Sequence, residues 1–169
     1  MISKNLENLL NTQMKNEFYS AYFYLSMSAW LSGKNLSGFA NWFLVQAQEE
    51  RDHATMMMNY LLRVGVTPDF YAIEQPNQDF TSPMDICEKT LAHEQKVTAM
   101  IYNIMNAAQE EHDYKTIQFL QWFVTEQTEE EENAQGLIER LKISSNSESG
   151  ILYIDAEMAA RVYVPAVQA

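Results

Sequence analysis

The stretch Glu50-Arg51-Asp52-His53 decides the fold, because it places a carboxylate and an imidazole where a packed helix needs apolar side chains. Alternating steps of four and three residues through residues 39–64 give an otherwise largely apolar series. Such a series follows the face of a helix that packs into a bundle. Burying a carboxylate costs several kcal/mol unless it is paired or binds a metal. The position of Glu50 therefore predicts a neutralising partner in the core.

Three other helical segments carry the same interruption. Glu17, Glu94 and Glu130 each stand near the middle of a comparable apolar series. His53 and Gln127 each lie three residues from one of the four glutamates, on the same helix face, and both side chains can act as ligands. This pattern is typical of four-helix bundles that hold a carboxylate-bridged pair of metal ions. Four carboxylates also balance the charge of two divalent cations.

Ion pairs with lysine or arginine are the competing explanation for buried glutamates. Arg51 lies one position away from the apolar series, and Lys15, Lys89 and Lys96 lie outside the series of their helices. Four equivalent glutamates without suitable cationic neighbours favour metal binding over four separate ion pairs.

Composition narrows the possible functions. The 169 residues carry a net charge of −12, which argues against nucleic-acid binding because no basic patch is available for phosphates. A single cysteine, Cys87, excludes an intrachain disulfide and favours the cytoplasm. The N-terminus does not resemble a signal peptide, and no apolar run approaches the roughly 18 residues of a membrane span. We expect one domain over residues 1–169, with no membrane association.

Periodicity and capping residues predict an all-α protein with helices at about residues 4–33, 35–64, 83–111, 114–142 and 151–162. Residues 65–82 lack this periodicity and contain Pro68 and Pro76. Fully extended, such a segment reaches about 60 Å. We therefore expect a long crossover that returns along the bundle and starts the third helix parallel to the second.

Further polar residues accompany the four core glutamates. Tyr24 lies two turns after Glu17 on the same face, so its hydroxyl can reach the polar centre. Glu126 and Glu129 share an adjacent face of the fourth helix, beside Glu49 if the helices pack as expected. These three acids either hold a further metal ion or belong to a solvated charged face.

With these residues in place, the chain resembles the bacterial non-haem ferritins over its whole length, including the crossover and the short fifth helix. The resemblance implies iron storage in a hollow shell of twenty-four chains. It also implies a ferroxidase that oxidises Fe²⁺ with O₂ or H₂O₂ and deposits the ferric product as a mineral.

The resemblance also implies roles for individual residues. It implies a diiron centre with ligands from all four long helices: Glu17, Glu50, His53, Glu94, Gln127 and Glu130. Glu50 would bridge the two iron ions, and Tyr24 matches a tyrosine beside the centre. It implies a third iron site formed by a second set of carboxylates: Glu49, Glu126, Glu129 and Glu130.

Three alternatives stay open at this point. Bacterioferritins carry a histidine in the Glu-x-x-His pair of the fourth helix and a haem-ligating methionine after the bridging glutamate. Here those positions hold Glu130 and Arg51, so we expect no haem. A di-iron or di-manganese oxidase for an organic substrate would need a channel to the site. A metal-free structural bundle is the third alternative.

Overall fold

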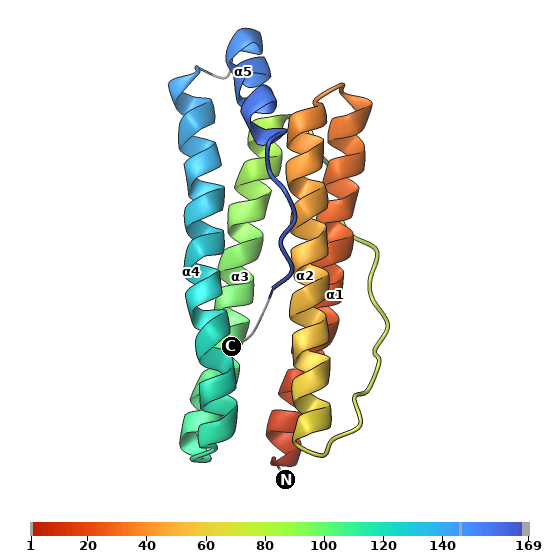
Figure 1. Cartoon of the computed structure of the whole chain (residues 1–169), viewed down its shortest axis with the longest axis vertical. Coiled ribbons are helices and arrows are strands. Elements are labelled where there is room, and N and C mark those ends of the chain that lie inside the picture. The colour runs from red at the N-terminus through yellow and green to blue at the C-terminus, as the bar shows by residue number, and fades with distance from the viewer. Residues whose placement is uncertain (1, 146, 167–169) are drawn as a thin grey trace.

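The chain folds into a long four-helix bundle with a short fifth helix at one end (Figure 1). The computed structural model describes residues 2–145 and 147–166. The helices are α1 (Lys4–Gly33), α2 (Ser37–Arg63), α3 (Pro83–Glu110), α4 (Tyr114–Ile143) and α5 (Glu148–Met158). None of the helices described is long and apolar enough to cross a membrane. The predicted all-α bundle is confirmed.

Local capping chemistry sets most helix starts. Ser3 accepts a hydrogen bond from the backbone of Leu6, and Ser82 accepts one from Asp85, as N-cap residues do. The second helix begins two residues later than the expected position 35. Asn35 has a φ of 60°, in the left-handed region, and no residue there can continue a right-handed helix.

The crossover after α2 runs along the outside of α1 and brings the chain back to the start of α3 (Figure 1). Two contacts fix it to α1. The backbone N–H of Asp69 donates to Asn11 Oδ1 at 2.8 Å. Lys15 Nζ forms an ion pair with Glu74 Oε2 at 3.1 Å. The crossover makes α3 parallel to α2, as the length of residues 65–82 predicted.

The core consists of two apolar clusters along the bundle axis. One contains Leu31, Phe39 and Phe43, and the other contains Leu6 and Leu120. The buried glutamates Glu17, Glu50, Glu94 and Glu130 lie between these clusters. Because each cluster seals one end, the polar layer is removed from bulk water without any additional domain.

The fifth helix differs from its expected position at residues 151–162. Ser147 accepts a hydrogen bond from the backbone of Gly150 at 3.2 Å, so the helix starts at Glu148 and ends four residues early, at Met158. The helix also packs tightly on α2. A Cβ added to Gly38 would lie 1.6 Å from the carbonyl oxygen of Asp155, so only glycine permits this approach.

Candidate metal centre

Four glutamates, one from each long helix, form the polar layer. Glu17, Glu50, Glu94 and Glu130 expose between 1% and 5% of their surface. In the described part of the chain, none of these carboxylates forms an ion pair with a lysine or arginine. The layer thus concentrates acidic groups without a built-in cation in direct contact.

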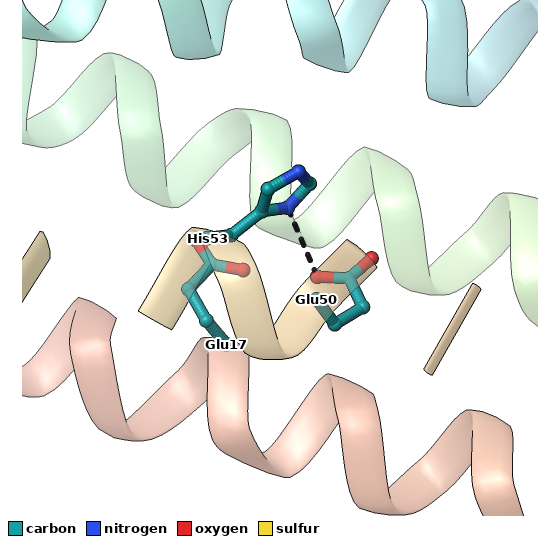
Figure 2. Close-up of side chains that lie close together, drawn as sticks. All are labelled: Glu17, Glu50 and His53. Carbon is teal, nitrogen blue, oxygen red and sulfur yellow. Dashed lines mark ion pairs between the residues drawn. The ribbon is translucent and has the colours of Figure 1, made fainter. Parts of the chain in front are cut away.

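One half of the layer already has the geometry of a metal site. Glu17, Glu50 and His53 each offer a ligand atom, and these atoms lie within 4.8 Å of one another. His53 Nδ1 lies 3.3 Å from Glu50 Oε2 (Figure 2). Glu17 Oε2 is buried and has no hydrogen-bond partner. An orphaned buried carboxylate oxygen is costly, and a metal ion at this point would satisfy it.

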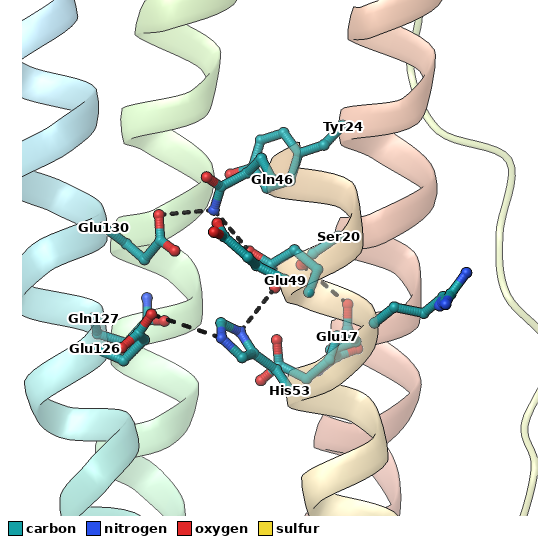
Figure 3. Close-up of polar contacts among 12 residues, drawn as sticks. Glu17, Ser20, Tyr24, Gln46, Glu49, His53, Glu126, Gln127 and Glu130 are labelled. Carbon is teal, nitrogen blue, oxygen red and sulfur yellow. Dashed lines mark hydrogen bonds and ion pairs between the residues drawn. The ribbon is translucent and has the colours of Figure 1, made fainter. Parts of the chain in front are cut away.

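The other half of the layer contains Glu94 and Glu130, held by amides and a phenol. The hydroxyl of Tyr24 donates a short hydrogen bond to Glu94. Gln127 Nε2 donates to Glu94 Oε2 at 3.2 Å. Gln46 Nε2 donates to Glu130 Oε2 at 2.8 Å, which links α2 to α4 across the layer (Figure 3).

Two glutamines of this layer were not predicted as site residues. Gln46 also donates to Glu50 Oε1 at 3.4 Å, so one amide contacts two of the carboxylates. Gln13 Nε2 donates to Glu17 Oε1 at 2.8 Å. Their positions on the apolar series could have identified them as site residues, because a buried amide at such a position is unusual, like a buried carboxylate.

Burial raises the proton affinity of the whole layer. Burial and the neighbouring Glu50 carboxylate raise the pKa of Glu17 to about 8. Burial and the charge of Glu94 raise the pKa of Glu130 to about 8, and burial raises the pKa of Glu94 to about 7. Burial, with repulsion from Glu94 and Glu130, also raises the pKa of Glu50 well above its usual value. Without metal, these carboxyl groups therefore retain protons at a higher pH than ordinary glutamates do.

The three outer acids, Glu49, Glu126 and Glu129, are arranged more loosely than the four glutamates of the layer. Glu126 Oε1 lies 3.8 Å from His53 Nε2, a buried nitrogen without a hydrogen-bond partner. Glu49 forms an ion pair with Arg161, and Glu129 is exposed at the surface of α4. Among the described residues, only Glu17, Glu50 and His53 gather their ligand atoms within 4.8 Å. The imidazole of His53 thus lies between the inner layer and the outer acids.

Carboxylate oxygens with one imidazole suit hard or intermediate cations such as iron and manganese. One glutamate per helix, with a Glu-x-x-His pair on α2, defines the class of bundles that bind a carboxylate-bridged metal pair. Residues 7–144 match the ferritin-like domain family, and the chain belongs to this family.

Within this family, the chain is similar to ferritins from bacteria and from an archaeon. The chain is 37% identical to "Bacterial non-heme ferritin" of Staphylococcus aureus over 163 residues, covering 96% of this chain and 98% of that protein. It is 37% identical to the protein of the same name from Campylobacter jejuni over 155 residues, covering 92% and 93% of the two chains. An open-pore ferritin from Archaeoglobus fulgidus is 38% identical, with a TM-score of 0.94 and coverage of 96% and 99%.

Proposed function

We propose that this protein stores iron and that it oxidises Fe²⁺ before storing it. The observation that carries the proposal is the buried layer of four glutamates. Glu17 Oε2 lacks a hydrogen-bond partner, and none of the four glutamates forms an ion pair with a lysine or arginine of the described chain. Membership of the ferritin-like family and the likeness to bacterial non-heme ferritins support iron as the metal.

Each side chain then has a role at the centre. Glu17, Glu50 and His53 bind the first Fe²⁺, and Glu50 bridges to the second. Glu94 and Glu130 bind the second Fe²⁺, with Gln127 beside it. The geometry of Glu17, Glu50 and His53 supports the first half, and the convergence of the remaining side chains through their hydrogen bonds supports the second.

The residues around the iron ions control protons and ligand orientation. Iron binding displaces the protons that the buried carboxyl groups hold near neutral pH. Tyr24 fixes Glu94, and Gln46 fixes Glu130. Two Fe²⁺ ions supply two electrons, which together with two protons reduce one O₂ to H₂O₂. H₂O₂ is the other oxidant that the resemblance suggests.

An oxidase for an organic substrate has less support. Two cavities, of about 1370 Å³ and 700 Å³, lie at the two ends of the bundle. The first is lined by residues near the α3–α4 turn, and the second by residues of α4 and α5. Neither is lined by Glu17, Glu50, Glu94 or Glu130. Small reactants such as Fe²⁺ and O₂ therefore fit the layer better than a bulky substrate.

The iron-storage proposal also includes assembly into a shell of twenty-four chains. Purified apoprotein is expected to elute at a mass near twenty-four times 19.6 kDa. After repeated aerobic additions of Fe²⁺, ferric iron is expected to elute with it, well beyond the amount needed to fill the binding sites. Buffer without protein gives the rate of spontaneous oxidation. A monomer, or iron that precipitates outside the protein fraction, would contradict the proposal.

The third iron site is a separate part of the proposal. We assign it to Glu49, Glu126 and Glu129, with Glu130 shared with the inner layer. Replacing Glu49, Glu126 and Glu129 together by alanine should leave the first oxidation phase intact, at about two Fe²⁺ per chain, because the inner four carboxylates balance two divalent ions. Later additions should show a changed ratio of iron to oxygen consumed and slower recovery of the fast phase.

Stopped-flow absorbance and oxygen consumption over successive small additions of Fe²⁺ measure these phases. The matched control is Glu88→Ala/Glu110→Ala/Glu132→Ala, which removes the same charge from exposed positions. Loss of the first phase in the test variant would place its residues in the diiron centre. Identical behaviour of the two triple variants would mean that Glu49, Glu126 and Glu129 bind no iron and only form a solvent-exposed charged face.

A further inference from the structure

The segment after α5 runs along α2 and contacts Glu49, one of the three outer acids. Residues 159–166 leave the helix and run beside α2, in the same direction as that helix (Figure 1). Asn41 Nδ2 donates to the carbonyl of Arg161 at 2.9 Å. Further along, Asp52 Oδ2 accepts from the Tyr163 hydroxyl at 2.6 Å and from the Ala166 backbone at 3.0 Å. This strap, residues 159–166, is attached to α2 before Arg161 as well, through a bond from Asn41 Nδ2 to the carbonyl of Ala159 at 3.5 Å.

The guanidinium of Arg161 is fixed by three groups on one face of α2. It lies over the Trp42 ring, 4.2 Å from the centroid. Its Nη1 donates to Gln46 Oε1 at 2.9 Å, and its Nη2 forms an ion pair with Glu49. The Arg161 and Glu49 side chains are each only 20% exposed, so water screens this pair less than an ordinary surface pair.

The same guanidinium influences acids beyond Glu49. Its positive charge opposes the rise that burial causes in the pKa of Glu126 and of Glu130. It also fixes the amide of Gln46, whose Nε2 contacts the inner layer. A basic group supplied by the chain itself therefore lies among the acids assigned to the third iron site.

A second observation marks this region as a place for a ligand. His53 Nε2 belongs to a side chain that is only 2% exposed, it has no hydrogen-bond partner, and it lies 3.8 Å from Glu126 Oε1. The site is thus incomplete on the side of His53 and Glu126. On the side of Glu49, Arg161 holds the carboxylate that a metal ion would need.

We propose that Arg161 is a tethered cation that competes with metal ions for Glu49, so that the outer site fills only when the strap lifts from α2. This inference rests on the proposed third site and adds a specificity-determining residue to it. Removing this competing charge should tighten metal binding at the outer site about tenfold.

The test uses assembled apoprotein and Zn²⁺, a probe that undergoes no redox chemistry. Equilibrium dialysis of wild type and of Arg161→Gln counts the Zn²⁺ bound per chain and its affinity. The variant should bind the outer Zn²⁺ about tenfold more tightly, with the two inner ions still bound. Arg63→Gln is the matched control, because Arg63 also lies on an aromatic ring of α2, at 5.5 Å, but about 21 Å from Glu49 along that helix.

Two further measurements test whether release of the strap, and not only the loss of one positive charge, changes the affinity of the outer site. Asp52→Asn weakens the acceptor for Tyr163 and Ala166 while leaving Arg161 in place, and it should also tighten the outer site. In wild type, hydrogen exchange in the peptide spanning residues 159–166 should accelerate when the outer Zn²⁺ binds. Equal affinities in Arg161→Gln and Arg63→Gln, or unchanged exchange at outer-site saturation, would overturn the proposal.

Glu49→Gln distinguishes failure of the strap from failure of the third site. Glu49→Gln should abolish Zn²⁺ binding at the outer site both in wild type and in Arg161→Gln. If it does so while Arg161→Gln alone changes nothing, the third site stands and the competing role of Arg161 is wrong. If Glu49→Gln changes nothing in either background, the third site itself is wrong and the inference falls with it.

Discussion

Replacing Glu50 or His53 by alanine is expected to slow the fast oxidation of Fe²⁺ by at least about 100-fold. Mutation of groups that only orient the ligands commonly lowers metal affinity or activity by about 10–100-fold. Loss of a ligand itself should therefore have a larger effect. Both residues belong to the tightest group of potential ligand atoms in the described chain. Stopped-flow measurement of the first two Fe²⁺ added per chain gives the rate.

The same variants should still assemble, because the apolar clusters on both sides of the layer remain intact. Asn59→Ala, at an exposed position on α2, is the control for the effect of mutation on this helix. Metal-free Glu50→Gln keeps the side-chain volume and should melt no lower than wild type, since it removes a carboxyl group that burial disfavours. A large drop in melting temperature would mean that Glu50 stabilises the fold through an ion pair and would contradict its assignment as a ligand.

Much of the bundle could be predicted because its helices follow the expected apolar series. Every series position in α1, from Leu6 to Leu31, is buried, and so is every one in α4, from Leu120 to Leu141. In α3, the intermediate positions differ. The series of four-residue and three-residue steps through Glu94 includes Leu91, Thr98 and Met105, which are only half-buried, and the residues directly before them, Thr90, Val97 and Ile104, are buried instead. Cys87, Glu94, Ile101 and Ala108 are spaced seven residues apart and belong to both series, whether the step of three or the step of four comes first. Only packing against the neighbouring helices decides which residue between them is buried.

Contacts between distant residues could not be predicted from local patterns. The partners of Arg161 on α2 lie more than 110 residues earlier in the chain, and nothing in its own segment identifies them. The direction of the Gln46 amide likewise depends on Glu130 from another helix. Sequence patterns therefore identified side chains that belong in the layer, while their mutual orientation required the packed structure.

The metal-free protein is expected to lose stability as the pH rises from 6.5 to 8.5. Burial raises the folded-state pKa of Glu17 and Glu130 to about 8 and that of Glu94 to about 7, above the ordinary value of 4.5. In this range the folded chain binds more protons than the unfolded chain, whose carboxyl groups are already ionised. Stability must therefore fall with rising pH, on the order of 4 kcal/mol per chain over this window.

The titration of His93 sets the lower limit of the pH range, 6.5, in which stability should fall. Burial lowers its pKa to about 4, so the folded chain keeps this imidazole neutral while the unfolded chain protonates it below pH 6.5. His93 therefore reduces stability as the pH falls from 6.5 towards 4, opposite to the effect of the glutamates. Above pH 6.5 the unfolded imidazole loses its remaining charge, so the contribution of His93 fades and the carboxyl groups of the layer dominate the slope.

Thermal unfolding of apoprotein between pH 6.5 and 8.5, with and without saturating Zn²⁺, measures this effect. Zn²⁺ should remove the downward slope, because the metal replaces protons on the carboxyl groups and binds more tightly as the pH rises. Glu17→Gln should flatten the slope of the apoprotein, since one raised pKa is lost, whereas the exposed Glu132→Gln should not. An apoprotein whose melting temperature stays level or rises over this window would show that its four core glutamates are already ionised and balanced, and the reason for assigning them to metal ions would be lost.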